Sequence, residues 1–196
     1  MDLTVEIYEL LGVSPEEADK KALTLLSLAQ TQNEKDTISW ARGYVLVELK
    51  KFSEALDIWQ GIFDRTHDHK ALHQIGFVHR SSGNLSMAVN IFNQERSLIS
   101  SDDTKSLAIN LYEQSYCNFL LGYMRKAHEF LCHYERLSVN EVDFVERGCF
   151  FRLRGDLYKS SDKNIAKAAY EESLKFFMQA QDDVSVLEIK ERLSGL

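Results

Sequence analysis

The sequence has little that breaks a helix or anchors a chain in a membrane. Proline occurs once and glycine nine times in 196 residues, so long helices are favoured over a turn-rich sandwich or barrel. No run approaches 18 apolar residues, and the N-terminus has no basic stretch before its apolar residues, unlike a secretory signal. The three cysteines are scattered, which suits a reducing compartment. We therefore predict one domain over residues 1–196, cytoplasmic and without membrane attachment.

Strong positive charge and catalytic motifs are also missing. The formal net charge is −7 and the basic residues are dispersed, so no nucleic-acid surface is expected. There is no nucleophile elbow, phosphate loop, dinucleotide-binding glycine pattern or HExxH motif. His69 and His73 would share a helix face as two metal ligands do, but no third ligand is evident. We predict no enzymatic activity, no cofactor and no metal site, with a metal protein built on these histidines as a minor alternative.

What the sequence does contain is an internal repeat near 33 residues. Each copy reads as two helices joined by a short turn, with a small residue in each helix and a large residue four positions after the second small one. Copy by copy, these positions hold Gly43, Ala55 and Trp59; Gly76, Ala88 and Phe92; Ser115, Ala127 and Leu131; and Gly155, Ala166 and Tyr170. The small residues let two helices approach closely, and the large residues are predicted to fill the gap to the next unit. Because no unit can bury its apolar face alone, neighbouring units must stack.

This pattern resembles the tetratricopeptide repeat (TPR) family. The helix–turn–helix length, the Gly43–Ala55 spacing and the aromatic residue four positions after the alanine match that family, although the usual aromatic is replaced by Ser39 and the closing prolines are absent. The resemblance implies an all-α, right-handed solenoid of about four antiparallel helix pairs over residues 36–180. Residues 1–35 would then form N-terminal cap helices, and residues 181–196 a C-terminal capping helix.

Local signals predict how the two caps begin and which faces they bury. Ser14 and Glu17 have the spacing of a capping box at the start of a helix over residues 14–32. Asp183 is expected to cap the last helix. That helix would turn Leu187 and Leu193 inward and keep Glu188, Lys190, Glu191 and Arg192 in water.

The resemblance also implies where a ligand would bind. In a TPR stack the first helix of each pair lines the concave face. The positions carried over to this face are Trp40, Tyr44, His73, Phe77, Arg80, Tyr112, Tyr116, Phe119 and Arg152. Such an aromatic face suits an apolar or amphipathic peptide rather than the acidic C-terminus that some TPR domains clamp with Lys and Asn. For each ring, a place in the core between repeats is the alternative.

These observations predict a non-catalytic protein- or peptide-binding TPR adaptor that uses an aromatic concave groove. Bacterial peptide signalling and a chaperone role are two narrower hypotheses. The alternative is a structural, homo-oligomeric assembly protein whose aromatic face binds a second copy, so a homodimer is one predicted state.

Overall fold

A computed structural model describes residues 4–137 and 143–196. All regular secondary structure in these ranges is helical, which confirms the predicted all-α class. No helix within them is both long and apolar enough to cross a membrane. In chain order the helices are α1 (Val5–Leu11), α2 (Pro15–Leu28), α3 (Gln32–Glu48), α4 (Phe52–Thr66), α5 (His69–Ser81), α6 (Leu85–Leu98), α7 (Thr104–Leu120), α8 (Met124–Leu137), α9 (Phe144–Tyr158), α10 (Lys163–Gln179) and α11 (Asp183–Ser194).

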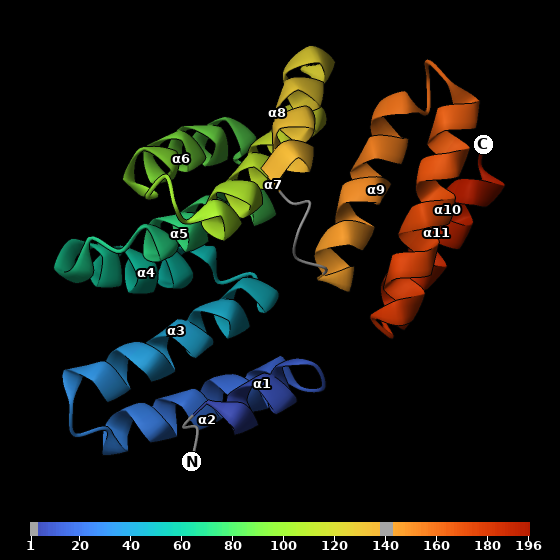
Figure 1. The fold of residues 1–196 in the computed structure, drawn as a ribbon. Coiled ribbons are helices and arrows are strands. Elements are labelled where there is room, and N and C mark those ends of the chain that lie inside the picture. The colour runs from blue at the N-terminus through green and yellow to red at the C-terminus, as the bar shows by residue number, and fades with distance from the viewer. Residues whose placement is uncertain (1–3, 138–142) are drawn as a thin grey trace. The chain divides into compact units, whose positions relative to one another are not determined.

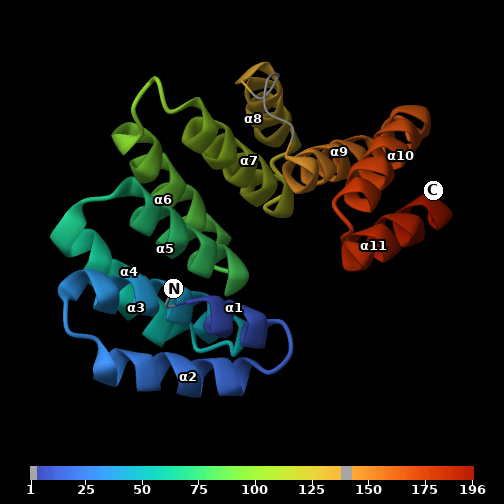
Figure 2. The same cartoon turned by 60° about the horizontal axis from the view of Figure 1, so that its bottom comes forward.

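The chain divides into two compact units, Met1–Leu98 and Ile99–Leu196. In the first unit, α1 to α6 form three successive helix pairs, and each helix packs against the helices before and after it (Figure 1). In the second unit, α7 packs on α8, α9 packs on α10, and α11 packs on α10 (Figure 2). The assignment of residues 1–196 to one domain stays a prediction.

Three of the four predicted pairs are closed by a ring that lies on a glycine. A Cβ atom built on Gly43 would lie 2.6 Å from Cε2 of Trp59 and closer still to Cζ2. The same construction on Gly76 meets the ring of Phe92 at 2.6 Å, and on Gly155 it meets Cδ1 of Tyr170 at 2.5 Å. Each ring occupies the space that a side chain would need, so glycine is what lets the two helices come this close.

The third pair closes by a hydrogen bond instead of a ring. Ser115 stands at the glycine position, and its hydroxyl donates to the carbonyl oxygen of Ala127 at 2.7 Å. The large residue of this pair is Leu131, whose side chain is smaller than the rings of the other pairs. Compared with the other pairs, the third pair therefore has a smaller residue on α8 (Leu131 in place of a ring) and a larger residue on α7 (Ser115 in place of glycine).

The role predicted for the large residues needs a correction. They were expected to fill the gap between units, yet Trp59 lies over Gly43 of its own pair. Trp59 contributes to the neighbouring pair as well, because it shares a buried cluster with Leu72 and Ile75 of α5. The indole thus packs both within its own pair, on Gly43, and against the next pair, on Leu72 and Ile75.

The turns inside the pairs repeat a left-handed backbone residue. Gly83 and Gly122 occupy it with φ of 81° and 79°, where an L side chain would be strained. Lys50, which precedes Gly83 by the repeat length, takes the same conformation with φ of 58°. The repeat therefore extends to the backbone of the turn, even where the glycine is absent.

The N-terminal helices begin and end differently from the prediction. Ser14 precedes α2, but its side chain accepts no capping hydrogen bond, so the predicted capping box is wrong. The capping box lies at α3 instead, where the Thr31 hydroxyl accepts from the Glu34 amide and the Glu34 carboxylate accepts from the Thr31 amide. The first repeat helix consequently starts at Gln32, ahead of the predicted boundary at residue 36.

The C-terminal helix is present, with a different start and a different buried face. Asp182, not Asp183, caps α11, since its side chain accepts from the amide of Ser185. Ile189 is fully buried, whereas Leu187 is 61% exposed. Leu193 packs against the same buried cluster as Ile189, as predicted, but the helix turns Leu187 outward and turns Glu188 and Arg192 toward α9, as described below.

Candidate functional site

The predicted residues of the first unit lie on α3 and α5, where they form a run of ring contacts with α1. The rings of Tyr8 and Tyr44 have centroids 6.3 Å apart, and those of Tyr44 and Phe77 are 6.4 Å apart. The Arg80 guanidinium lies 5.2 Å from the Phe77 centroid, within cation–π range. Tyr8 is exposed, and the other three are half-buried. We call these four residues the first-unit aromatic face.

Two of the predicted rings also belong to the core. Trp40 meets the buried Trp59 at a centroid distance of 6.3 Å, and Tyr44 meets it at 5.3 Å, both close to edge-on. Both pack against the buried cluster around Trp59, and burial raises the pKa of the Tyr44 hydroxyl. Both rings thus pack against the core while part of each side chain stays exposed, and their place in a binding groove stays a prediction.

His73 faces a buried carboxylate on α6. Its Nδ1 lies 3.0 Å from Oε1 of Glu95, and Nδ1 of His69 lies 3.8 Å from the same oxygen. Glu95 is only 2% exposed. No group of three His, Cys, Asp or Glu side chains that could hold a metal occurs among the described residues. His73 is therefore held by an internal contact beside the first-unit aromatic face.

In the second unit, Tyr112 and Tyr116 of α7 stack with centroids 6.2 Å apart and planes 14° apart. Tyr112 also meets Tyr134 of α8 at 6.2 Å, and Phe119 packs on the same buried cluster. Beside Tyr112 lies an open cavity of about 170 Å³, which we call the second-unit pocket. Its walls are formed by Ile109, Tyr112, Tyr134, Val145, Glu146 and Cys149.

Burial favours the neutral forms of two polar groups in the wall of this pocket. Burial raises the pKa of the Cys149 thiol and holds the pKa of the Tyr112 hydroxyl well above its usual range, although Arg152 acts the other way on both groups. Glu146 supplies the only charged side chain among the six wall residues. The second-unit pocket is therefore mainly apolar, and it is smaller than the roughly 300–1,000 Å³ typical of drug-sized ligands.

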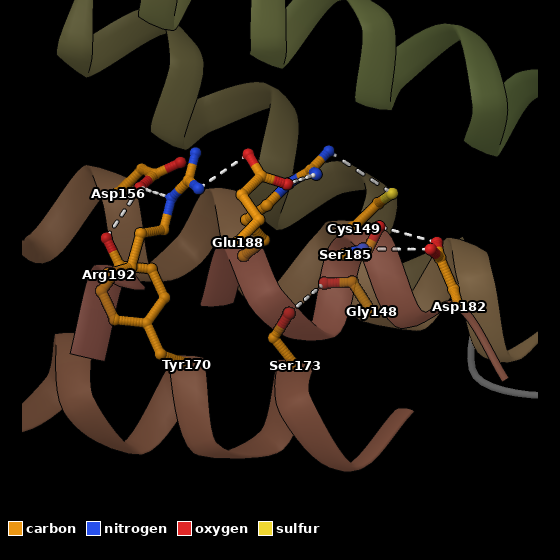
Figure 3. Close-up of polar contacts among 10 residues, drawn as sticks. Gly148, Cys149, Asp156, Tyr170, Ser173, Asp182, Ser185, Glu188 and Arg192 are labelled. Carbon is orange, nitrogen blue, oxygen red and sulfur yellow. Dashed lines mark hydrogen bonds and ion pairs between the residues drawn. The ribbon is translucent and has the colours of Figure 1, made fainter. Parts of the chain in front are cut away.

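Arg152 is part of an ionic network with the last helix. Its Nη1 donates to Oε2 of Glu188 at 2.8 Å. Arg192 donates from Nη1 to Oε1 of Glu188 at 2.7 Å and from Nε to Oδ1 of Asp156 at 3.0 Å (Figure 3). Asp156 also accepts from the Tyr170 hydroxyl at 2.7 Å. Two guanidinium groups and two carboxylates thus balance in charge and connect α9 with α11, and the Tyr170 hydroxyl joins α10 to this network.

The expectation that Glu188 and Arg192 point into water is therefore wrong. Both are half-buried and face α9. Burial alone would raise the pKa of Glu188, but Arg152 and Arg192 outweigh it and hold that pKa below its usual value. Since the predicted ligand-binding residue Arg152 already bonds Glu188, its guanidinium has only part of its donors left for a ligand.

The sequence did not identify Tyr8 as part of the first-unit aromatic face, or Tyr134 and Cys149 as walls of the second-unit pocket. Tyr8 was assigned to a cap, although α1 packs on α2 and α3 as the first helix of a pair does. The sequence signal available for Tyr8 was the pair of helices predicted within residues 1–35. Tyr134 lies on α8, the second helix of the third pair, and Cys149 lies on α9, the first helix of the fourth pair. Only the structure, which brings both beside Tyr112, shows that they line the pocket.

The stacked pairs, closed by small residues, define a TPR-type helical-repeat fold, and solved structures agree. PlcR of Bacillus thuringiensis, solved in complex with the peptide PapR7 and DNA, matches with a TM-score of 0.77 at 14% identity, over 97% of this chain and 72% of that chain. YrrB, described as a TPR protein with an unusual peptide-binding site, matches with a TM-score of 0.53 at 15% identity, over 94% of this chain and 88% of that chain. MamA of Desulfovibrio magneticus RS-1 matches with a TM-score of 0.56 at 16% identity, over 93% of this chain and 98% of that chain.

No protein-family model and no curated protein matches the sequence. The likeness therefore rests on the arrangement of the helices, and it confirms the predicted TPR-like, α-solenoid fold. By fold, the chain is a TPR-like protein.

Proposed function

We propose that this chain is a non-catalytic module that binds a peptide or a peptide segment of a protein. The observation that carries the proposal is the second-unit pocket, a mainly apolar cavity of about 170 Å³ beside Tyr112. A cavity of this size takes one apolar side chain, and burying such a side chain contributes about 1.5–3 kcal/mol. The ligand class is therefore an apolar or amphipathic peptide with one anchoring residue.

Two further observations support this proposal. The first-unit aromatic face offers half-buried and exposed rings of the kind that contribute most to peptide and protein binding. In addition, two proteins of similar fold are a peptide complex and a protein with a peptide-binding site. Peptide signalling is the narrower role we favour, ahead of a chaperone role. The PlcR structure also contains DNA, but a formal net charge of −7 does not favour phosphate contacts by these residues.

A displayed library of random ten-residue peptides provides the test. We expect enriched peptides to share Leu, Ile, Met or Phe at one position. Replacing that residue by serine should weaken binding about tenfold or more in calorimetric titration. Ile109→Trp, which fills the second-unit pocket, should weaken binding to a similar extent. Lys105→Trp adds the same ring to an exposed position of α7 and should leave binding unchanged.

The outcomes separate this proposal from self-assembly. Failure to enrich any peptide, or full binding by Ile109→Trp, would contradict the peptide-binding role. Light scattering on the wild type and on Tyr44→Ala/Phe77→Ala/Tyr116→Ala then tests the assembly alternative. A wild-type dimer that becomes a folded monomer would assign the aromatic residues to a self-interface instead of a peptide.

A further inference from the structure

A thiol, an imidazole and a phenol meet between α8 and the end of α9. Cys132 and His128 are four residues apart on α8 and share one helix face, with Sγ 3.6 Å from Nδ1 of the imidazole. The other ring nitrogen, Nε2, lies 2.7 Å from the hydroxyl oxygen of Tyr158. We call these three residues the Cys132 cluster.

The Cys132 cluster borders a cavity that is separate from the second-unit pocket. This cavity is open and measures about 210 Å³, and its other walls are Leu131, Glu135, Phe150 and Arg154. Nη1 of Arg154 donates to Oε1 of Glu135 at 3.3 Å, so a positive and a negative group stand together beside apolar surface. Because pockets for drug-sized ligands measure roughly 300–1,000 Å³, this one suits a group the size of an amino acid.

The contact with Tyr158 holds the imidazole beside the thiol. Sγ of Cys132 lies 3.6 Å from Nδ1 and 4.0 Å from Nε2, so the sulfur lies against the ring between its two nitrogens and not on the axis of either lone pair. A protonated imidazole at this distance stabilises the thiolate electrostatically, and Nδ1 is near enough to take up the thiol proton through one water molecule or after a rotation of the ring. A nucleophile, a base, a residue that positions the base and an adjoining cavity are the parts of a reactive site.

We propose that Cys132 is a site of thiol–disulfide exchange with small zwitterionic disulfides of the cystine class. The thiolate attacks one sulfur of the disulfide, and a new S–S bond forms as the old one breaks. The Cys132 sulfur is oxidised, and the departing sulfur is reduced and leaves as a thiolate that takes the proton from His128. The group left on Cys132 occupies the cavity, where its ammonium and carboxylate meet Glu135 and Arg154.

The chain supplies two internal comparisons. Cys117 is fully buried, so a disulfide reagent does not reach it in the folded protein. Burial raises the pKa of Cys149, which lowers its thiolate fraction and its reactivity. Selective reaction at Cys132 is therefore the expected pattern.

The test is the rate of mixed-disulfide formation with cystine, resolved by residue through peptide mass mapping after an acid quench. We expect Cys132 to react at least about tenfold faster than Cys149, and faster than an unfolded peptide carrying the same cysteine. His128→Gln should slow Cys132 about tenfold or more at pH 7 and shift its pH–rate profile to higher pH. Tyr158→Phe should cause a smaller change of the same sign.

His133→Gln is the matched control, because His133 adjoins Cys132 in sequence but is exposed and lies outside the cavity wall. Circular dichroism would establish that each variant is folded. The proposal is overturned if Cys132 reacts no faster than the peptide, or if His128→Gln and His133→Gln behave alike. The ligand class is tested with cystamine and dithiodiglycolate, which carry one sign of charge. Equal rates for these two and cystine would refute recognition by Arg154 and Glu135.

Discussion

Replacing Gly43 by alanine should destabilise the first unit, although alanine is the better helix former. In an open helix this change stabilises by about 0.8–1.0 kcal/mol. Here the new methyl group would lie 2.6 Å from Cε2 of Trp59, so the indole or the backbone of α3 must move. Trp59 is fully buried and packed on Leu72 and Ile75, so moving its ring disturbs the core of the first unit.

The magnitude follows from two opposing effects. Overpacking a well-packed core costs about 1–3 kcal/mol. A contact of 2.6 Å against a buried ring belongs in the upper part of that range, so the cost exceeds the gain in helix propensity. The expected net loss is about 1–2 kcal/mol in the free energy of unfolding, or roughly 2–4 °C in Tm for each kcal/mol in a chain of this size. Urea unfolding followed by circular dichroism at 222 nm measures it, provided the slopes of variant and wild type agree.

Gly61→Ala is the internal control for this prediction. Gly61 is also helical, but a Cβ atom there would meet only Nη1 of Arg65 at 3.6 Å, an ordinary contact. This variant should be more stable than the wild type, by up to about 1 kcal/mol. If Gly43→Ala proved as stable as Gly61→Ala, the ring of Trp59 would not be what requires a glycine.

Three further predictions concern the helix ends, the third pair and the last helix. Thr31→Ala should cost about 1 kcal/mol in urea unfolding, whereas Ser14→Ala, whose side chain caps nothing, should cost almost none. Ser115→Ala should cost about 1 kcal/mol in the same assay, through loss of its buried hydrogen bond to α8. The pKa of Glu188 lies below its usual 4.5 in the folded chain. Its stabilisation is therefore present above that pH and lost as the pH falls through the lowered value. Glu188→Gln should accordingly show a smaller drop in urea midpoint between pH 6 and pH 3 than the wild type, and equal drops would contradict this.

The helix pairs could be predicted from the sequence because small residues recur at a fixed spacing. Gly43 and Gly76 mark the closest approach in each pair, and Trp59 and Phe92 occupy the space that they leave. These contacts lie within a single pair, so the repeat length alone aligns them. The same periodicity did not assign the sides of α11, because Leu187 and Ile189 are both apolar and only packing on α9 and α10 selects Ile189.

The candidate site was harder to predict because its cavities join residues from several helices. Tyr112 was predicted from the resemblance, whereas Cys149 and Tyr134 enter the same pocket from α9 and α8. Ion pairs between helices were difficult to predict for the same reason. Arg152 looked free on its own helix, yet Glu188 on α11 bonds it at 2.8 Å, and no local pattern connects two residues 36 positions apart.

The third pair, with Ser115 and Leu131 at these two positions, is a compensated form of the glycine and ring found in the others. It follows that neither member of such a couple can be exchanged alone, whereas both can be exchanged together: Gly43→Ser and Trp59→Leu should each destabilise, and their combination should cost less than the sum. A comparison made position by position counts such a joint exchange as two differences, while the distance between the helices is preserved.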